Sequence, residues 1–169
     1  DFDPNFLNPV SLYLLKNNLE FQKELRGHLL KRFGIDTLQL TSIVHLRTVE
    51  GLVGLIPPYV EISEEEVLII PQEGEKSPPR SQKIRVPLLI DGIHRAWLAR
   101  EMGVVLKCLV VRSPLEISTS SYPVPWQEVR IYDEVPPLKK YYRRVPSYSL
   151  MRPLDAIRMM TKNSKEYGR

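Results

Sequence analysis

The sequence is short of cysteine and of long apolar runs, and each shortage excludes a class of protein. Cys108 is the single cysteine, so an internal disulfide and a cysteine-rich metal site are both excluded. No apolar run approaches the roughly 20 residues of a membrane-spanning helix, and no signal peptide is visible. We therefore expect no membrane partner and a reducing, cytoplasmic setting.

Common catalytic signatures are absent as well. The chain has no P-loop, no metal-ligand cluster, no Ser/His/Asp constellation recognisable by spacing, and no internal or heptad repeat. Eight glycines stand against fifteen prolines, a ratio that predicts stiff, extended connections and many element ends. With 169 residues and a net charge of +4, we expect one sizeable core with appended elements and a surface compatible with anionic partners.

The clearest pattern in the chain is a strand, a tight turn, a helix and a second strand. Residues 86–90 form an apolar run that predicts a buried strand, and it stops at the turn dipeptide Asp91-Gly92. Helical spacing begins directly after this dipeptide and continues to residue 102. A second apolar run, residues 104–111, predicts the next strand.

The pattern also predicts which way the helix faces and where it ends. Ile93 and Trp97 share one face, which we expect to pack on the core, whereas Arg95 lies off that face. Gly103 is expected to end the helix in a left-handed conformation.

The turn has the chemistry of an anion site. Gly92 has no side chain to keep a ligand from the backbone, and the first amides of the helix, from Ile93 to Arg95, carry the positive end of its dipole. His94 and Arg95 add side-chain donors, and Asp91 could hold a metal ion or a hydroxyl group. The expected ligand is a nucleotide phosphate. The alternative is a plain turn followed by a solvated Arg95.

Residues 90–96, followed by residues 99–103 and an apolar strand, resemble the signature of the ParB/sulfiredoxin superfamily. The resemblance covers residues 86–112 and implies an α+β fold, a compact mixed sheet with flanking helices. In that superfamily the box that opens the helix binds nucleotide phosphates. Its members include CTP-using DNA partition proteins, ATP-using sulfiredoxins and free serine kinases.

The box matches these members unevenly. Asp91-Gly92 match the opening of the kinase-type box, and His94-Arg95 match its His-Arg pair. Ile93 stands where sulfiredoxin has its reactive cysteine and where the kinase-type box has a first histidine, so sulfinic-acid reduction is disfavoured. The partition proteins usually carry an arginine pair, of which only Arg95 is present.

Three segments are expected along the chain. Residues 1–34 are predicted to be an N-terminal helical segment, with one or two helices across residues 9–33 after the cap Asn8. Residues 35–113 would form the ParB/sulfiredoxin-like core. Residues 114–169 would be a proline-rich, basic extension packed on that core.

Within the core segment the local patterns are less distinct. Residues 38–43 alternate as a strand would, and residues 48–55 suit a short helix or a loop. Residues 59–62 and 67–70 predict two paired strands joined by a turn. Residues 72–85 are polar and predict an exposed loop ahead of the strand that enters the turn.

Other charged residues are candidates for the same chemistry. His45 and Arg47 could contact a bound anion if their segment folds back over the box. An acidic group upstream of the box could supply a general base or a Mg²⁺ ligand, and the resemblance implies a glutamate base there. The alternative is that this group forms a solvated turn. The residues of the group are Glu61, Glu64, Glu65 and Glu66.

A second candidate site lies near the C-terminus, where four cations bracket two tyrosines. Cations can contact phosphates and tyrosine rings can stack on bases, so this stretch is a candidate nucleic-acid contact. The alternative is a solvated connector whose tyrosines pack inward. Its residues are Lys139, Lys140, Tyr141, Tyr142, Arg143 and Arg144.

Two functions fit these observations. The first is a nucleotide-dependent phosphotransferase that binds ATP or another nucleotide with Mg²⁺ at Gly92 to Arg95 and acts on a small hydroxyl acceptor, with Asp91 and His94 as catalytic residues. The second is a ParB-like DNA-binding or nuclease-like module that uses the nucleotide as a switch. No helix-turn-helix is visible after the core, which disfavours a partition protein. A relative that has lost nucleotide binding is the third possibility.

Overall fold

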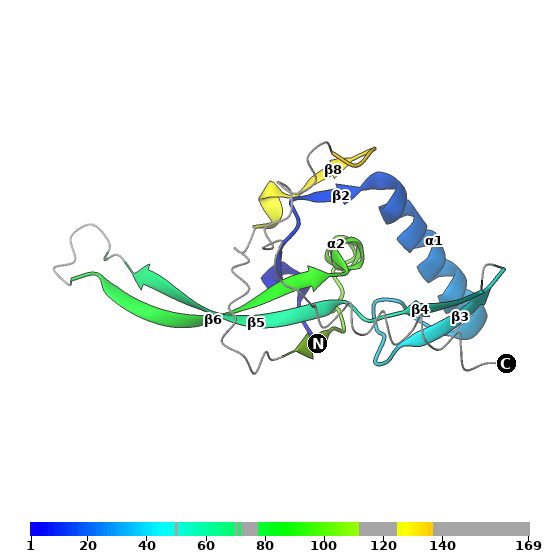
Figure 1. Cartoon of the computed structure of the whole chain (residues 1–169), viewed down its shortest axis with the longest axis horizontal. Coiled ribbons are helices and arrows are strands. Elements are labelled where there is room, and N and C mark those ends of the chain that lie inside the picture. The colour runs from blue at the N-terminus through cyan, green and yellow to red at the C-terminus, as the bar shows by residue number, and fades with distance from the viewer. Residues whose placement is uncertain (50, 70, 72–77, 112–124, 137–169) are drawn as a thin grey trace.

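The computed structural model describes residues 1–49, 51–69, 71, 78–111 and 125–136, and Figure 1 shows their arrangement. The fold is α+β, as predicted, and its main sheet has four strands in the order β1-β6-β5-β7. The described elements are η1 (Pro4–Phe6), β1 (Asn8–Pro9), β2 (Tyr13–Leu15), α1 (Lys16–Phe33), β3 (Val44–Thr48), β4 (Gly51–Leu55), β5 (Tyr59–Ile69), β6 (Arg80–Asp91), α2 (Ile93–Glu101), β7 (Leu109–Val111), η2 (Trp126–Glu128) and β8 (Arg130–Tyr132).

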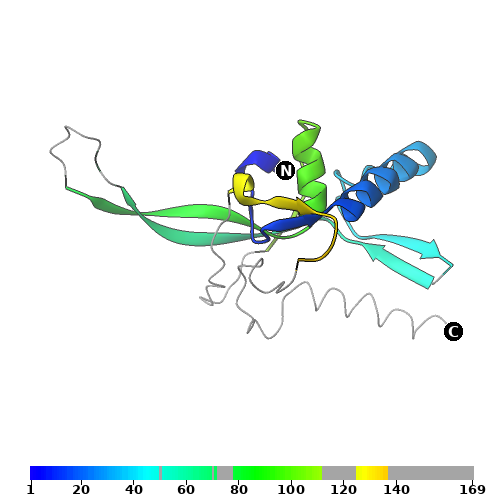
Figure 2. The same cartoon turned by 90° about the horizontal axis from the view of Figure 1, so that it is seen from above.

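The main sheet is built around one long antiparallel pair, β5 and β6. β7 lies parallel to β5 only along Tyr59 to Glu61, and β1 lies parallel to β6 only at Leu88 and Leu89. Beyond these short neighbours, β5 and β6 continue as a two-stranded ribbon that leaves the body of the molecule in both views (Figures 1 and 2).

The ribbon corrects two predictions. β5 is one continuous strand, so the predicted turn between residues 59–62 and 67–70 is wrong, and the predicted loop is strand from Arg80 onward. The pattern of one strand does not reveal which charges lie opposite on its partner. Glu64 lies opposite Arg85 with its carboxylate 3.5 Å from the guanidinium, and Glu66 lies opposite Lys83.

The predicted start of the N-terminal helix, at residue 9, is wrong. α1 starts at Lys16, because Asn8 and Pro9 pair with β6 instead of opening a helix. An outer strand tolerates Pro9, since its missing amide removes no interior ladder bond. The end of the helix is as expected from the sequence: Gly34 is left-handed, with φ of 67°.

Two more predictions change in the segment between α1 and β5. Residues 48–55 are neither helix nor loop, because Gly51–Leu55 pairs with Val44–Thr48 as a hairpin. Residues 38–43 contain no strand. The second strand of the central motif is also shorter than predicted and spans only Leu109–Val111.

The core lies between the main sheet and the two α-helices. Val60 and Leu89 of the central strands are buried with Ala96, Leu98 and Ala99 of α2. The same cluster takes Leu7, Leu14 and Leu19 from the N-terminal segment, Leu38 and Leu106 from loops, and Trp126 and Val129 from the chain after β7.

Trp126 fixes the last described segment against α2. Its indole N–H donates to the carbonyl of Pro4 at 2.9 Å, and its ring meets the ring of Trp97 edge-on at 5.9 Å. The guanidinium of Arg100 lies 5.7 Å from both ring centres, a cation–π arrangement.

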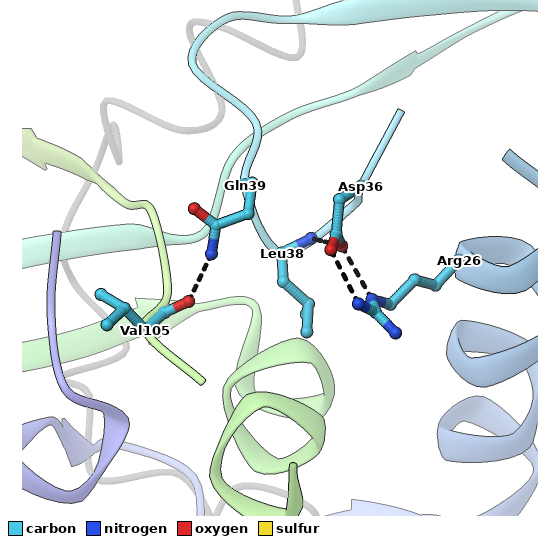
Figure 3. A network of polar contacts seen from close by, with 5 residues as sticks. All are labelled: Arg26, Asp36, Leu38, Gln39 and Val105. Atoms are coloured by element: carbon cyan, nitrogen blue, oxygen red, sulfur yellow. Dashed lines mark hydrogen bonds and ion pairs between the residues drawn. The ribbon is translucent and has the colours of Figure 1, made fainter. Parts of the chain in front are cut away.

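A carboxylate clasp holds the loop after α1 (Figure 3). Asp36 accepts two hydrogen bonds from the guanidinium of Arg26, both at 2.7 Å, and one from the amide of Leu38 at 2.9 Å. The hydrogen bond from Arg26 lowers the pKa of Asp36. The clasp sets the loop so that Leu38 enters the core, where it is fully buried.

We expect Asp36→Ala to lower the free energy of unfolding by about 1–2 kcal/mol, because it removes three charge-assisted hydrogen bonds from a half-buried site. Urea unfolding at pH 7 measures the change. The pKa of Asp36 is lowered in the folded state, so this contribution is present above about pH 4 and is lost as the pH falls below it.

Asp133→Ala is the matched control. Asp133 lies 4.0 Å from Lys16, and these side chains are 87% and 59% exposed, so we expect a loss of less than about 0.5 kcal/mol. Equal losses for the two variants would show that the clasp is no stronger than a surface ion pair.

Candidate functional site

The turn between β6 and α2 is built as the sequence predicts. β6 ends at Asp91, Gly92 is left-handed with φ of 89°, and α2 begins at Ile93. The first helical hydrogen bond runs from the amide of Ala96 to the carbonyl of Gly92 at 2.9 Å. The three amides before it, from Ile93 to Arg95, donate to no backbone carbonyl in the part of the chain that the structure describes. They stand at the positive end of the helix dipole.

Gly92 is required by its neighbour Pro58 as well as by its backbone angle. A Cβ atom at residue 92 would lie 2.7 Å from Cβ and 2.9 Å from Cα of Pro58. The sequence suggests that Gly92 leaves space for a ligand, whereas in the structure the backbone of Pro58 occupies that side. The close approach therefore joins the corner to the start of β5.

Arg95 lies inside the protein, which corrects the prediction that it is off the packed face. The residue is only 8% exposed, and it shares the buried face of α2 with Ala96, Leu98 and Ala99. Burial lowers the pKa of Arg95, whereas the charge of Asp91 and then that of Cys108 raise it. The solvated alternative for Arg95 is thereby excluded.

One nitrogen of this buried guanidinium is unsatisfied. Nη1 of Arg95 is shielded from solvent and has no hydrogen-bond partner among the residues that the structure describes. A buried donor without an acceptor costs about 1–3 kcal/mol, and more for a charged group. Such a group indicates either stored strain or a missing acceptor.

His94 has a structural partner of its own. Its Nε2 accepts a hydrogen bond from the amide of Leu15 at 3.0 Å, which ties the start of α2 to the start of α1. Burial lowers the pKa of His94, and the charge of Asp91 opposes this shift. A ring that accepts at Nε2 is neutral and carries its proton on Nδ1. Sequence reasoning missed this bond, because 79 residues separate its two ends.

The remaining residues of the corner are half-buried. Asp91 lies opposite Tyr59 at the end of the sheet and takes part in an interaction of its own. Ile93 packs against the main core cluster, as predicted.

A cavity of about 190 Å³ opens at the same end of the sheet. Tyr59 pairs with both Asp91 and Leu109, so the corner and the start of β7 flank the same strand. None of residues 91–95 lines the cavity, and no pattern in the sequence predicts it. Its walls come from three chain segments: Leu40, Thr41, Pro57, Lys107, Cys108 and Leu109, together with Asp1.

The other candidate residues lie apart from the corner or outside the described residues. His45 and Arg47 are exposed on the β3–β4 hairpin. Glu64 and Glu66 lie on the ribbon, where Glu66 accepts a hydrogen bond from Ser81. The basic stretch 139–144 lies outside the described residues.

Glu61 is the acidic residue of that group nearest the end of the sheet. It lies two positions after Tyr59 on β5, and burial together with the charge of Glu61 raises the pKa of Tyr59 to about 12. Among the described residues, no group of three or more His, Cys, Asp or Glu side chains is arranged to hold a metal ion. No helix in the described ranges is long and apolar enough to cross a membrane.

The comparisons with known proteins give one match. The family model described as the ParB CE domain matches residues 2–132, a span that runs from before η1 to the end of β8 and includes the whole corner. No curated protein and no solved structure matched the chain.

We expect Gly92→Ala to lower the free energy of unfolding by at least about 2 kcal/mol, because alanine is strained at this φ and its Cβ would meet the backbone of Pro58. Gly27→Ala is the matched control, since Gly27 is exposed within α1 and an added Cβ touches nothing within 4 Å. That change should stabilise the protein by about 0.5–1 kcal/mol. Urea unfolding of both variants checks the opposite signs.

We also expect stability to fall as the pH is lowered through about 6.5, the unfolded-state pKa of histidine. The pKa of His94 is lowered in the folded state, so the unfolded chain binds more protons in this window, and folding weakens as the pH drops. Urea unfolding at pH 5 to 8 measures the slope. His94→Gln should flatten it, because an amide oxygen can accept from Leu15 without titrating.

His28→Gln is the control for this slope, since His28 is exposed on α1. Its profile should match that of the unchanged protein. A profile of His94→Gln as steep as that of His28→Gln would contradict the role given to the Leu15 hydrogen bond.

Proposed function

The chain belongs to the ParB CE domain family, and we propose that it binds a nucleotide through phosphate groups at the Asp91-Gly92 corner. The observation that carries the proposal is the unsatisfied Nη1 of Arg95, a buried residue in the same first turn of α2 as the amides of Ile93 and His94. A guanidinium and the first amides of a helix are both groups that bind phosphate oxygens.

An anion at this position would offset the free-energy cost of burying the charged guanidinium of Arg95 without a full set of hydrogen bonds. It would supply an acceptor for Nη1 and for the first amides of α2, which donate to no described backbone carbonyl. It would also offset the burial that lowers the pKa of Arg95, because a negative charge favours the charged guanidinium. Part of the affinity for phosphate would therefore come from hydrogen bonds that the folded protein leaves unmade.

The proposal is for binding, and phosphoryl transfer to a small hydroxyl acceptor stays a prediction from the resemblance. Nε2 of His94 is occupied by Leu15, and Asp91 has an interaction of its own, so neither stands ready as a catalytic base. Any Mg²⁺ would come with the phosphates, since that ion prefers phosphate oxygens and water to an all-protein cage.

We expect ATP, ADP, CTP or GTP with Mg²⁺ to raise the Tm of the protein in a thermal unfolding screen, with affinity confirmed by calorimetry. A ligand at 100 times its Kd adds about 2.7 kcal/mol, or about 5–10 °C in a domain of this size. Arg95→Met should abolish the shift. Its Tm without ligand should equal or exceed that of the unchanged protein, because the change removes a buried, unsatisfied charge.

Arg130→Gln is the charge-matched control, because Arg130 is exposed on β8. It should keep the full nucleotide shift. Absence of any shift in the unchanged protein, or an equal shift in Arg95→Met, would overturn the proposal. A salt-dependent affinity for DNA without nucleotide binding would instead favour the nucleic-acid alternative.

A further inference from the structure

We propose that the cavity between Thr41 and Lys107 holds the nucleoside end of the nucleotide whose phosphates bind at the Asp91-Gly92 corner. This inference rests on the proposed function and extends it to a second compartment. The cavity and the corner meet at one end of the main sheet, on either side of the chain segment Pro57-Pro58.

The backbone of Pro57-Pro58 brings the corner and the cavity close to each other. Pro58 packs against Gly92 of the corner, while Pro57, one residue earlier, lines the cavity. The carbonyl of Pro58 also accepts a hydrogen bond from the amide of Leu109 at 2.8 Å, which brings the cavity wall on β7 against the same segment. The corner and the cavity are therefore neighbours on either side of Pro57-Pro58, both of which are buried, and a ligand that occupies both would cross this segment.

Arg95 interacts electrostatically with the corner, where the charge of Asp91 favours its charged form. The described residues of the cavity wall offer it no charged partner at neutral pH. Cys108 lines the cavity, and burial raises the pKa of its thiol to about 12. The thiol is therefore protonated at neutral pH and forms a neutral wall, not a nucleophile.

The cavity walls suit a compact group that is partly apolar. Leu40, Pro57 and Leu109 supply apolar surface, and Thr41 and Lys107 supply side-chain donors. Neither donor has a side-chain hydrogen bond or ion pair within the described ranges of the chain. Apolar walls with a few free donors are the usual lining of a site for part of an organic ligand.

The size of the cavity favours one part of a ligand over a whole one. At about 190 Å³ it is smaller than the roughly 300 Å³ at the lower end of small-molecule sites. A nucleotide divides naturally into a charged end and a compact heterocyclic end. The corner has the chemistry for the first, and the cavity has the lining and the size for the second.

The test compares a nucleotide with its charged end alone. ATP, CTP and GTP with Mg²⁺ are titrated by calorimetry against the full chain, beside inorganic tripolyphosphate with Mg²⁺. At least one nucleotide should bind about tenfold or more tightly than tripolyphosphate. Leu109→Trp should remove that advantage by filling the cavity, and it should leave the affinity for tripolyphosphate within about threefold of its original value.

Val110→Trp is the matched control. Val110 neighbours Leu109 on β7 with similar exposure, 41% against 37%, and it does not line the cavity. It should change neither affinity. Thr41→Phe fills the cavity from a different segment and should act as Leu109→Trp does, which keeps the test decisive if the tryptophan variant fails to fold.

The outcomes separate the two proposals. Equal affinities for nucleotides and tripolyphosphate in the unchanged protein would overturn the cavity inference and leave the phosphate site standing. A nucleotide advantage that survives both cavity variants would also overturn it. Binding of neither probe would overturn the proposed function and the inference together.

Discussion

The contact between Gly92 and Pro58 is the constraint on which the arrangement of the corner depends. It requires a residue without a Cβ in a left-handed conformation, and so it sets the point at which β6 must stop and α2 must start. With the start of α2 fixed against the beginning of β5, the helix lies over the sheet with Ala96 and Ala99 inward. Arg95 lies on the same face of α2, so the position at which the helix starts also places its guanidinium in the interior.

Burial then gives the two basic residues of the corner opposite states. His94 meets its burial by becoming a neutral acceptor for Leu15, so its polar atom is satisfied within the fold. Arg95 has no neutral form available near neutral pH, and one of its nitrogens stays without an acceptor. At the corner, the imidazole of His94 therefore has its hydrogen bond within the fold, whereas Nη1 of the Arg95 guanidinium lacks one among the described residues. The sequence suggested equal roles for the two residues.

The sequence predicts the corner well because its determinants are local: an apolar run, a turn dipeptide and helical spacing follow each other within 20 residues. It fails where the determinants are distant. The charges of residues 80–85 suit a loop until β5 supplies glutamates opposite them. Asn8 and Pro9 suit a helix start until β6 offers an edge. Ile93 and Trp97 pack against the core as predicted, but Arg95 was placed off the packed face because the pattern gives little weight to Ala96 and Ala99. Small side chains let the helix approach the sheet most closely.

The cavity had no local signal, because residues from four separate stretches of the chain line it: Asp1, Leu40 with Thr41, Pro57, and residues 107–109. The pairing of β5 with β7 brings the last two together. That register also explains why a ligand site would lie here. Tyr59 pairs with Asp91 on one side and with Leu109 on the other, so the loops that enter β5 and β7 and the turn that leaves β6 converge at one end of the sheet. Convergent strand ends leave backbone amides and loop side chains facing the same space. Arg95 is the charged residue that α2 buries beside this end of the sheet, and its unsatisfied nitrogen is the reason to look for a ligand there.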